Sequence, residues 1–401
     1  MTSPSGDPAR QTVQTTFRAE AIRALAVGIQ ETAVTTFAIL IAVKQFALGP
    51  TAKATLIGSF AVGLIGGLFI VPVIARRHWR VSHAAGMIQL ISMVGFLLAS
   101  FSKNSEILYV AGMCLGMGIL PMAIPLQTHY LRENFPDSSR GRLFSTSILI
   151  RALSAMFFSW LLGSWLDEDI NRFPQVAMLF AFASGAAAVC QFLIPSNPFH
   201  EDVKKPPIGR SIIWLKEDRV FARMIAAAMA MGLGVLSANA LRVDYLVNPA
   251  HTLEFDAETT ALITGVIPSV TRLISTFFWG WLFDHMNFFK LRAIVNLVFF
   301  AGILLYFSTG DLKIIAIGSA MFGLARGGGE ILWNLWVTKL ADPSHIAGYM
   351  SVHTFMTGLR VIAASYLGFY IVSLSSISTL ISVSSVFVIL SFVILWPLVF
   401  G

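Results

Sequence analysis

Residues 258–283 read ETTALITGVIPSVTRLISTFFWGWLF and decide the class of fold. After its first residue, this segment carries a single charged side chain, Arg272, near its middle. About twenty mostly apolar residues in an α-helix, at 1.5 Å rise per residue, cross the hydrocarbon core of a bilayer. The segment is long enough to be a transmembrane helix, and its central arginine is unexpected in a lipid environment.

Apolar segments of this length recur along the whole chain. The 401 residues are 56% hydrophobic and only 12% charged, with a mean hydropathy of +0.74. Soluble globular domains carry about twice that charged fraction. We therefore predict an all-α polytopic membrane protein with twelve transmembrane helices. The expected spans are residues 22–46, 51–75, 81–101, 106–131, 142–166, 173–194, 219–243, 258–283, 288–308, 312–338, 346–372 and 376–400.

A polar connection divides the twelve spans into two groups of six. We expect the following parts: a cytoplasmic tail at 1–21, a six-helix bundle at 22–194, a cytoplasmic linker at 195–218 and a second six-helix bundle at 219–401. The two bundles resemble each other weakly, and Arg151 and Arg360 fall in corresponding helices of the two groups. A parallel repeat of six spans is typical of secondary transporters, which bind substrate near mid-membrane where the repeats meet.

The loops predict the orientation of the chain in the membrane. Eighteen of the 28 lysines and arginines lie on the side of the two termini. Six lie in the opposite loops: Lys44, Lys53, Lys103, Arg172, Arg242 and Lys313. Cytoplasmic loops are the ones enriched in Lys and Arg, so both termini are expected in the cytoplasm. We expect a monomeric integral protein of a bacterial cytoplasmic (inner) membrane, in contact with membrane lipids.

The sequence speaks against several classes of function. The net charge is +7, but no basic stretch interleaved with aromatic residues could follow a nucleic-acid backbone. The chain contains no HExxH motif, no Gly-Lys-Ser/Thr phosphate loop and no His/Cys cluster. We therefore predict that the protein is not an enzyme, binds no nucleic acid, metal or cofactor, and depends on gradients rather than on ATP.

One short motif supports a family resemblance. Residues Gly280 to His285, with Asp284, followed by Lys290 and Arg292, resemble the cytoplasmic motif of the major facilitator superfamily (MFS). The resemblance implies a twelve-helix transporter fold and a latch of opposite charges on the cytoplasmic side. The first-half copy contains Arg76 and Arg77 but lacks the carboxylate. The resemblance therefore indicates gating roles for these five charged residues, and it identifies no subfamily.

Four arginines lie near the middle of apolar spans: Arg151, Arg272, Arg326 and Arg360. A charge at the bilayer centre costs about 2.5–3.5 kcal/mol even on the mildest scale, so such residues face a bundle interior or a water-filled path. Serine or threonine residues lie on the same helix face three or four residues from Arg151, Arg272 and Arg360. A guanidinium group suits the bidentate binding of a carboxylate or phosphate.

Arg326 belongs to a polar cluster in the tenth span. Glu330 follows one turn later, a spacing that allows an ion pair within the helix. Three glycines at 327–329 lie between the two and mark a close approach, a bend or an unwound turn. Trp333 and Asn334 follow. The family resemblance implies that this helix lines the central cavity, so these residues are candidates for substrate binding.

Two glutamates, Glu31 and Glu330, are the carboxylates placed well inside the spans. Burial disfavours the charged form of a carboxylate, so both are candidates for proton coupling. Glu330 is also a candidate structural partner of Arg326. Because Arg326 has its own glutamate, Arg151 and Arg360 are the arginines expected to be unpaired.

The excess of arginine over glutamate favours an anionic ligand. Arg151 and Arg360 are expected to bind the anion from opposite halves, while Arg272 and Arg326 set the potential of the cavity. Each arginine could equally be a structural or gating contact. We predict a secondary transporter, a symporter or antiporter, of a small organic or inorganic anion with protons as the candidate coupling ion. Two alternatives are a proton-coupled exporter of amphipathic compounds with gating arginines, and a non-transporting receptor or lipid-handling membrane protein.

Overall fold

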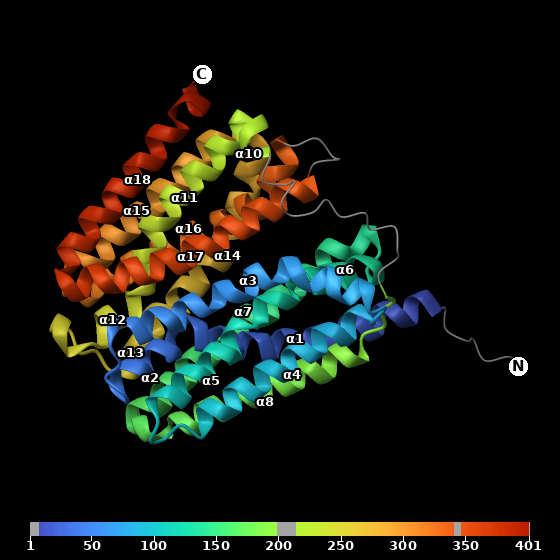
Figure 1. The fold of residues 1–401 in the computed structure, drawn as a ribbon, viewed down its shortest axis with the longest axis horizontal. Coiled ribbons are helices and arrows are strands. Elements are labelled where there is room, and N and C mark those ends of the chain that lie inside the picture. The colour runs from blue at the N-terminus through green and yellow to red at the C-terminus, as the bar shows by residue number, and fades with distance from the viewer. Residues whose placement is uncertain (1–7, 199–213, 341–345, 401) are drawn as a thin grey trace, which may run out of the picture. The chain divides into compact units, whose positions relative to one another are not determined.

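The computed structural model describes residues 8–198, 214–340 and 346–400, which form helices and no β-strand (Figure 1). Within those residues, eleven helices are long and apolar enough to cross a membrane. The expected span that this count leaves out is the tenth, α16 (Leu312–Leu340), a helix of 29 residues that contains Arg326 and Glu330. The predicted all-α fold with twelve membrane helices is confirmed.

The chain divides into two compact units. The first comprises Met1–Val34, Val62–Phe158 and Arg172–Lys204, and the second comprises Thr35–Ala61, Ser159–Asn171 and Lys205–Gly401. Two long helices, α3 (Pro50–Arg76) and α7 (Asp137–Glu168), contribute residues to both units. The predicted division into bundles at 22–194 and 219–401 stays a prediction, and most of the linker expected at 195–218 lies outside the described residues.

The first expected span is longer than the sequence suggested. It consists of α1 (Pro8–Thr32), the π-helical turn η1 (Ala33–Phe37) and α2 (Ala38–Lys44). The helix begins at Pro8, inside the tail expected over residues 1–21, and the assignment of that tail stays a prediction. The polar residues of this segment are accommodated in the helix, because Arg23 Nε donates to Glu20 Oε2 at 2.7 Å and both side chains are buried.

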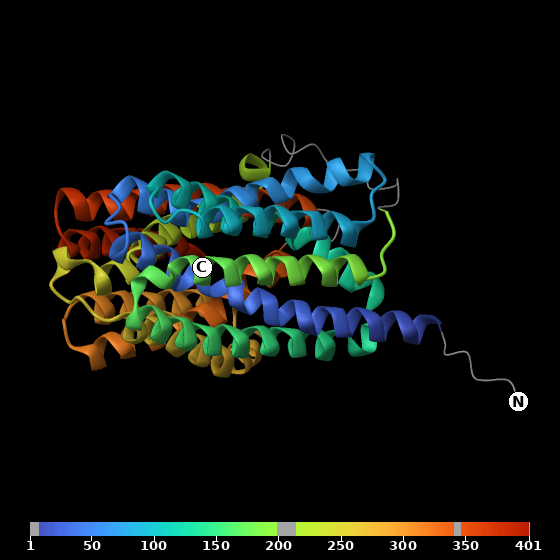
Figure 2. The ribbon, with the colours of Figure 1, turned by 90° about the horizontal axis from the view of Figure 1, so that it is seen from below.

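The first unit is organised around α4. It also contains α4 (Val81–Ser100), α5 (Glu106–Gly118), η2 (Leu120–Ala123), α6 (Ile124–Asn134) and α8 (Phe173–Leu193), while the 3₁₀ turn η3 (Ile170–Arg172) lies mostly in the second unit. Helix α4 packs against α5 and α8, and α1 packs against α8 (Figures 1 and 2). Pro121 and Pro125 interrupt the fourth span, where the 3₁₀ turn η2 separates α5 from α6.

The second unit contains the helices from α10 onward. They are α10 (Trp214–Glu217), α11 (Arg219–Ala240), α12 (Arg242–Val247), η4 (Pro249–His251), α13 (Ala257–Ala261), η5 (Leu262–Val266), α14 (Ile267–His285), α15 (Phe288–Phe307), α16, α17 (Ile346–Leu374) and α18 (Ile377–Phe400). Helix α11 packs against α17 and α18, and α16 packs against α14 and α15.

Aromatic side chains form the core at one end of this second unit. Phe221 of α11 stacks on Trp336 of α16, with ring centroids 5.7 Å apart, and lies 4.1 Å from the ring of Tyr349 of α17. The Tyr349 hydroxyl donates to Asp218, whose side chain also accepts from two backbone N–H groups at the start of α11. Packing and capping together therefore hold α11, α16 and α17 in register.

Candidate functional site

Glu330 of α16 lies between two arginines. Its Oε1 atom is 3.2 Å from Nη1 of Arg272 on α14 and 3.2 Å from Nε of Arg326, one turn earlier on α16. The Arg272 side chain is only 6% exposed, whereas the other two side chains are nearly half-exposed. One carboxylate therefore contacts two guanidinium groups. The side chain of Asn334, expected beside this cluster, lies outside the described part of the chain.

Glycine allows the two helices of this cluster to come close. A Cβ at Gly327 would lie 2.6 Å from Ser275 Oγ and 3.1 Å from the Arg272 carbonyl oxygen, both on α14. Any side chain at this position would push α14 away and separate Arg272 from Glu330. Helix α16 stays α-helical through residues 327–329. Of the three roles expected for these glycines, the structure shows close approach and not an unwound turn.

The hydroxyl groups near the arginines bond to backbone rather than to guanidinium groups. Ser275 and Thr276 both donate to the Arg272 carbonyl oxygen, at 3.1 and 2.7 Å. Thr357 donates in the same way to the carbonyl oxygen of His353, at 2.8 Å. The expected polar faces are present, but these three hydroxyls satisfy carbonyls of their own helices.

Arg360 of α17 lies against α11 in a different setting. Its Nη1 donates to the Ala228 carbonyl oxygen at 2.7 Å. Its side chain crosses Gly232, where any Cβ would overlap it. The Arg360 Nε is buried without a hydrogen-bond partner, and within the described residues no carboxylate pairs with this arginine. The guanidinium therefore keeps donor capacity for a ligand.

His353 precedes Arg360 on α17 and lies between two tryptophans of α16. Its ring centroid is 5.4 Å from that of Trp333 and 5.3 Å from that of Trp336. The His353 side chain is buried, and its Nε2 has no hydrogen-bond partner among the described residues. Trp333 Nε1 points to Thr357 Oγ1 at 3.5 Å, which is long for a hydrogen bond. The aromatic rings of α16 and the guanidinium of Arg360 on α17 thus belong to two neighbouring helices, α16 and α17.

In the first unit, Arg151 of α7 pairs with Glu31 of α1. The Nε of Arg151 is 3.4 Å from Oε2 of Glu31. The expectation that Arg151 is unpaired is therefore wrong. The cause is the packing of α1 beside α7, where Ser154 Oγ donates to the Leu25 carbonyl oxygen at 2.7 Å. Of the four arginines, Arg360 is the one without a carboxylate among the described residues. The predicted shared grip on an anion stays a prediction.

A buried ion pair between α3 and α12 was not foreseen. Lys53 Nζ lies 2.5 Å from Asp244 Oδ1, and the two side chains are 8% and 2% exposed. Asn248 Nδ2 lies 3.3 Å from each Asp244 oxygen, and His251 Nε2 lies 3.3 Å from Oδ2. The placement of Lys53 in a loop is wrong, because α3 begins at Pro50. A pair 191 residues apart leaves no local spacing signal.

Arg242 is a fifth buried arginine, and its placement in a loop is also wrong. It begins α12 and donates from Nη2 to Ser319 Oγ at 2.7 Å. Its Cζ lies 5.1 Å from the ring centroid of Tyr306 and 4.7 Å from that of Phe322. The negative ring faces stabilise a desolvated guanidinium. The sequence hint was the position of Arg242 within the seventh expected span, 219–243, next to its end.

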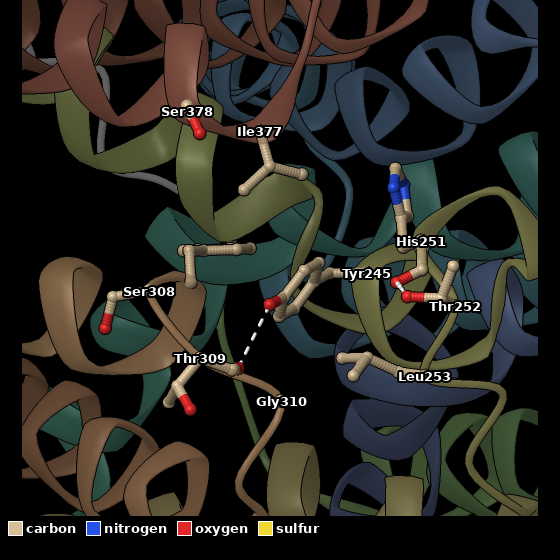
Figure 3. Close-up of a pocket in the computed structure, with 10 residues that line it drawn as sticks. Tyr245, His251, Thr252, Leu253, Ser308, Thr309, Gly310, Ile377 and Ser378 are labelled. Carbon is tan, nitrogen blue, oxygen red and sulfur yellow. Dashed lines mark hydrogen bonds between the residues drawn. The ribbon is translucent and has the colours of Figure 1, made fainter.

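A pocket of about 320 Å³ lies beside the ion pair in the second unit. Tyr245 and His251 form part of its wall, together with Thr309 after α15 and Ser378 at the start of α18 (Figure 3). The Tyr245 hydroxyl donates to the Thr309 carbonyl oxygen at 3.1 Å, the dashed line toward Thr309 in Figure 3. His251 connects the pocket with Asp244, because it lines the pocket and places Nε2 near the carboxylate.

The charged residues of the motif at Gly280–His285 and of its first-half counterpart lie near helix ends. Asp284 is exposed near the end of α14, Lys290 is exposed in the first turn of α15, and Arg292 is half-buried two residues later. Arg76 and Arg77 are exposed at the end of α3. Across the described residues, Asp284 forms no ion pair with these bases. Their gating roles stay a prediction.

A family model described as the Major Facilitator Superfamily matches residues 22–359. The chain belongs to the Major Facilitator Superfamily. The resemblance predicted from the motif at Gly280–His285 is thus confirmed, with no subfamily resolved. Membership of this family makes the protein a transporter rather than an enzyme. No match was found among curated proteins.

Solved MFS structures share the fold over nearly the whole chain. The nucleoside transporter NupG is 11% identical, with 96% of this chain and 98% of that chain covered and a TM-score of 0.73. A POT family transporter in complex with 5-aminolevulinic acid is 13% identical, with 100% and 98% covered and a TM-score of 0.71. The xylose transporter XylE from E. coli is 14% identical, with 96% and 98% covered and a TM-score of 0.67. At these identities the similarity shows the fold alone.

Proposed function

We propose that this MFS protein is a secondary transporter that moves a small anionic solute by alternating access. The observation that carries the proposal is the surplus of positive charge in the second unit. Arg272 and Arg326 share Glu330, and Arg360 has no carboxylate within the described residues. A buried charge is costly unless another charge or a ligand compensates it. An anion that contacts Arg360 supplies the compensation that no carboxylate among the described residues provides.

Arg360 is the proposed principal anion contact. It combines a fixed position over Gly232 with an Nε that has no partner among the described residues. Planar guanidinium donors suit a carboxylate or phosphate group, which accepts two parallel hydrogen bonds. Trp333 adds an aromatic surface on the neighbouring helix. These features support an organic anion with an apolar or aromatic part.

Arg151 and the two glutamates have separate proposed roles. Glu330 contacts two guanidinium groups, which supports its role as a counter-ion that holds α14 and α16 together. Glu31 is a mostly buried carboxylate that contacts Arg151, and its burial supports Glu31 as a proton carrier. Protonation of Glu31 would release Arg151 for an anion. Proton uptake and anion binding would then favour each other at this pair.

The proposal is tested by counterflow of radiolabelled carboxylates and phosphates into liposomes that contain the purified protein. Arg360→Gln and Arg151→Gln are expected to reduce anion flux at least tenfold. Arg10→Gln is the matched control, since Arg10 is exposed near the start of α1. Full anion flux in both test variants would exclude an anion-binding role for these arginines. A drug-susceptibility screen on overexpression tests the alternative of an amphipathic exporter.

A further inference from the structure

Asp244 is a buried carboxylate whose cation comes from another part of the chain. Lys53 on α3 contacts its Oδ1 at 2.5 Å. Its other partners, Asn248 and His251, follow in the same stretch as Asp244 itself, within one or two turns. A buried carboxylate without a counter-charge is strongly destabilising. Any movement that separates α3 from α12 therefore obliges Asp244 to find a replacement charge.

His251 is placed to supply that charge. Its Nε2 lies 3.3 Å from Asp244 Oδ2, and His251 is one of the residues that line the pocket shown in Figure 3. Histidine is the side chain that gains a proton near neutral pH. The second ring nitrogen can take a proton from water in the pocket, while the Nε2 hydrogen donates to the carboxylate. Protonation at this one ring replaces the charge that Lys53 carries in the paired state.

The surroundings of the pair contain few other charges. On α12, the ring of Tyr245 lies 5.8 Å from that of His251. On α17, the uncharged ring of Phe369 lies 5.4 Å from Lys53 Nζ. The pocket residues from α15, α18 and the loops at 252–253 and 308–310 carry no charge. Among the described contacts, Asp244 is thus the charged group beside His251, and Lys53 contacts the same carboxylate from α3.

We propose that Asp244 and His251 form a proton-binding site that fills when Lys53 leaves. The inference rests on the proposed transport function and deepens it, because it places a coupling proton at the contact of α3 and α12. In the paired state, Lys53 neutralises Asp244 and the imidazole is neutral. In the separated state, the imidazole binds one proton from bulk solvent, so that one proton is taken up in the step. The separated state binds the proton more tightly, so by linkage a lower pH favours separation.

The experiment measures the distance between α3 and α16 in the full chain as a function of pH. Spin labels are attached at Gly49→Cys, where a Cβ meets open space, and at Lys313→Cys, which is exposed. Cys114 and Cys190 are replaced by alanine. Double electron–electron resonance is recorded in lipid nanodiscs between pH 8 and pH 5 without any substrate. The population at the longer distance is expected to grow at least threefold as the pH falls.

Three variants decide the interpretation. His251→Gln is expected to abolish the pH response, because it cannot take the proton. Lys53→Met is expected to populate the longer distance already at pH 8. The matched control is His285→Gln, because His285 is exposed at the end of α14 and bonds to a carbonyl of its own helix. The control is expected to keep the full response.

The proposal is overturned if the parent protein shows no pH response, or if His251→Gln responds like the parent. It is also overturned if Lys53→Met shows the same distances as the parent at pH 8. His251→Gln leaves the Lys53–Asp244 pair in place, so it is expected to fold even if a variant of the pair itself does not. Because no substrate is added, a failure of anion transport would not affect the outcome.

Discussion

Replacing Arg360 by glutamine distinguishes the effect of the buried charge on protein stability from its effect on anion binding. The side chain of Arg360 donates to the Ala228 carbonyl oxygen and has no carboxylate partner among the described residues. Loss of that charged hydrogen bond costs about 1.5–3 kcal/mol. Loss of the charge itself relieves about 2.5–3.5 kcal/mol of membrane desolvation on the mildest scale. The two terms largely cancel, so the ligand-free stability is expected to change by no more than about 2 kcal/mol.

In the free energy of anion binding, the loss of the charged hydrogen bond has no compensating gain. A charged hydrogen bond to the ligand contributes about 1.5–3 kcal/mol, so its loss weakens binding roughly 10- to 150-fold. A ligand present at 100 times its Kd stabilises the folded protein by about 2.7 kcal/mol. With a 30-fold weaker Kd, the same ligand concentration stabilises Arg360→Gln by only about 0.8 kcal/mol. The variant should therefore be a stable protein that has lost most of its response to anions.

The assay is thermal unfolding of the purified protein, followed by tryptophan fluorescence, with a panel of carboxylates and phosphates. An anion that raises the Tm of the wild-type protein is expected to raise that of Arg10→Gln equally and that of Arg360→Gln much less. The reasoning is refuted if Arg360→Gln keeps the full anion-induced shift. It is also refuted if the ligand-free variant unfolds many degrees earlier, since the charge would then be structural.

Three further substitutions test the surroundings of this site. Glu330→Gln removes the carboxylate that contacts buried Arg272. Because Glu330 is partly exposed, the free energy of unfolding by denaturant is expected to fall by only about 1–2 kcal/mol. An unchanged denaturation midpoint would contradict the ion pair. Gly232→Ala places a methyl group against Arg360. We expect about fivefold weaker anion binding in the same thermal assay, which corresponds to the free energy of roughly one hydrogen bond. An unchanged affinity would mean that anion binding does not need the position that Gly232 gives Arg360. Asp218→Ala removes the N-terminal cap of α11. A denaturant titration should show a loss of about 1 kcal/mol in stability, while the anion affinity is retained. A loss of anion affinity would instead show that this end of α11 contributes to the anion site.

Much of the fold follows from the sequence because the insertion of a helix into the membrane depends on the hydrophobicity of contiguous residues. An apolar stretch of about twenty residues is a span wherever it occurs, since every backbone polar group must be satisfied within the helix. The same local logic made the Arg326–Glu330 pair foreseeable, because residues one turn apart meet on one helix face. The glycines at 327–329 and the motif at Gly280–His285 could also be recognised in the sequence, because each is a short contiguous segment.

The partners of the other buried charges were decided by tertiary structure. Arg151 meets Glu31 across 120 residues, and Lys53 meets Asp244 across 191. Such pairs form because packed helices bring distant positions together, and the free energy of a buried charge depends on that neighbour. The sequence by itself therefore determined which helices cross the membrane and which charges lie in or near them. Only the folded chain decided which of those charges neutralise one another, and left Arg360 without a carboxylate in the described structure.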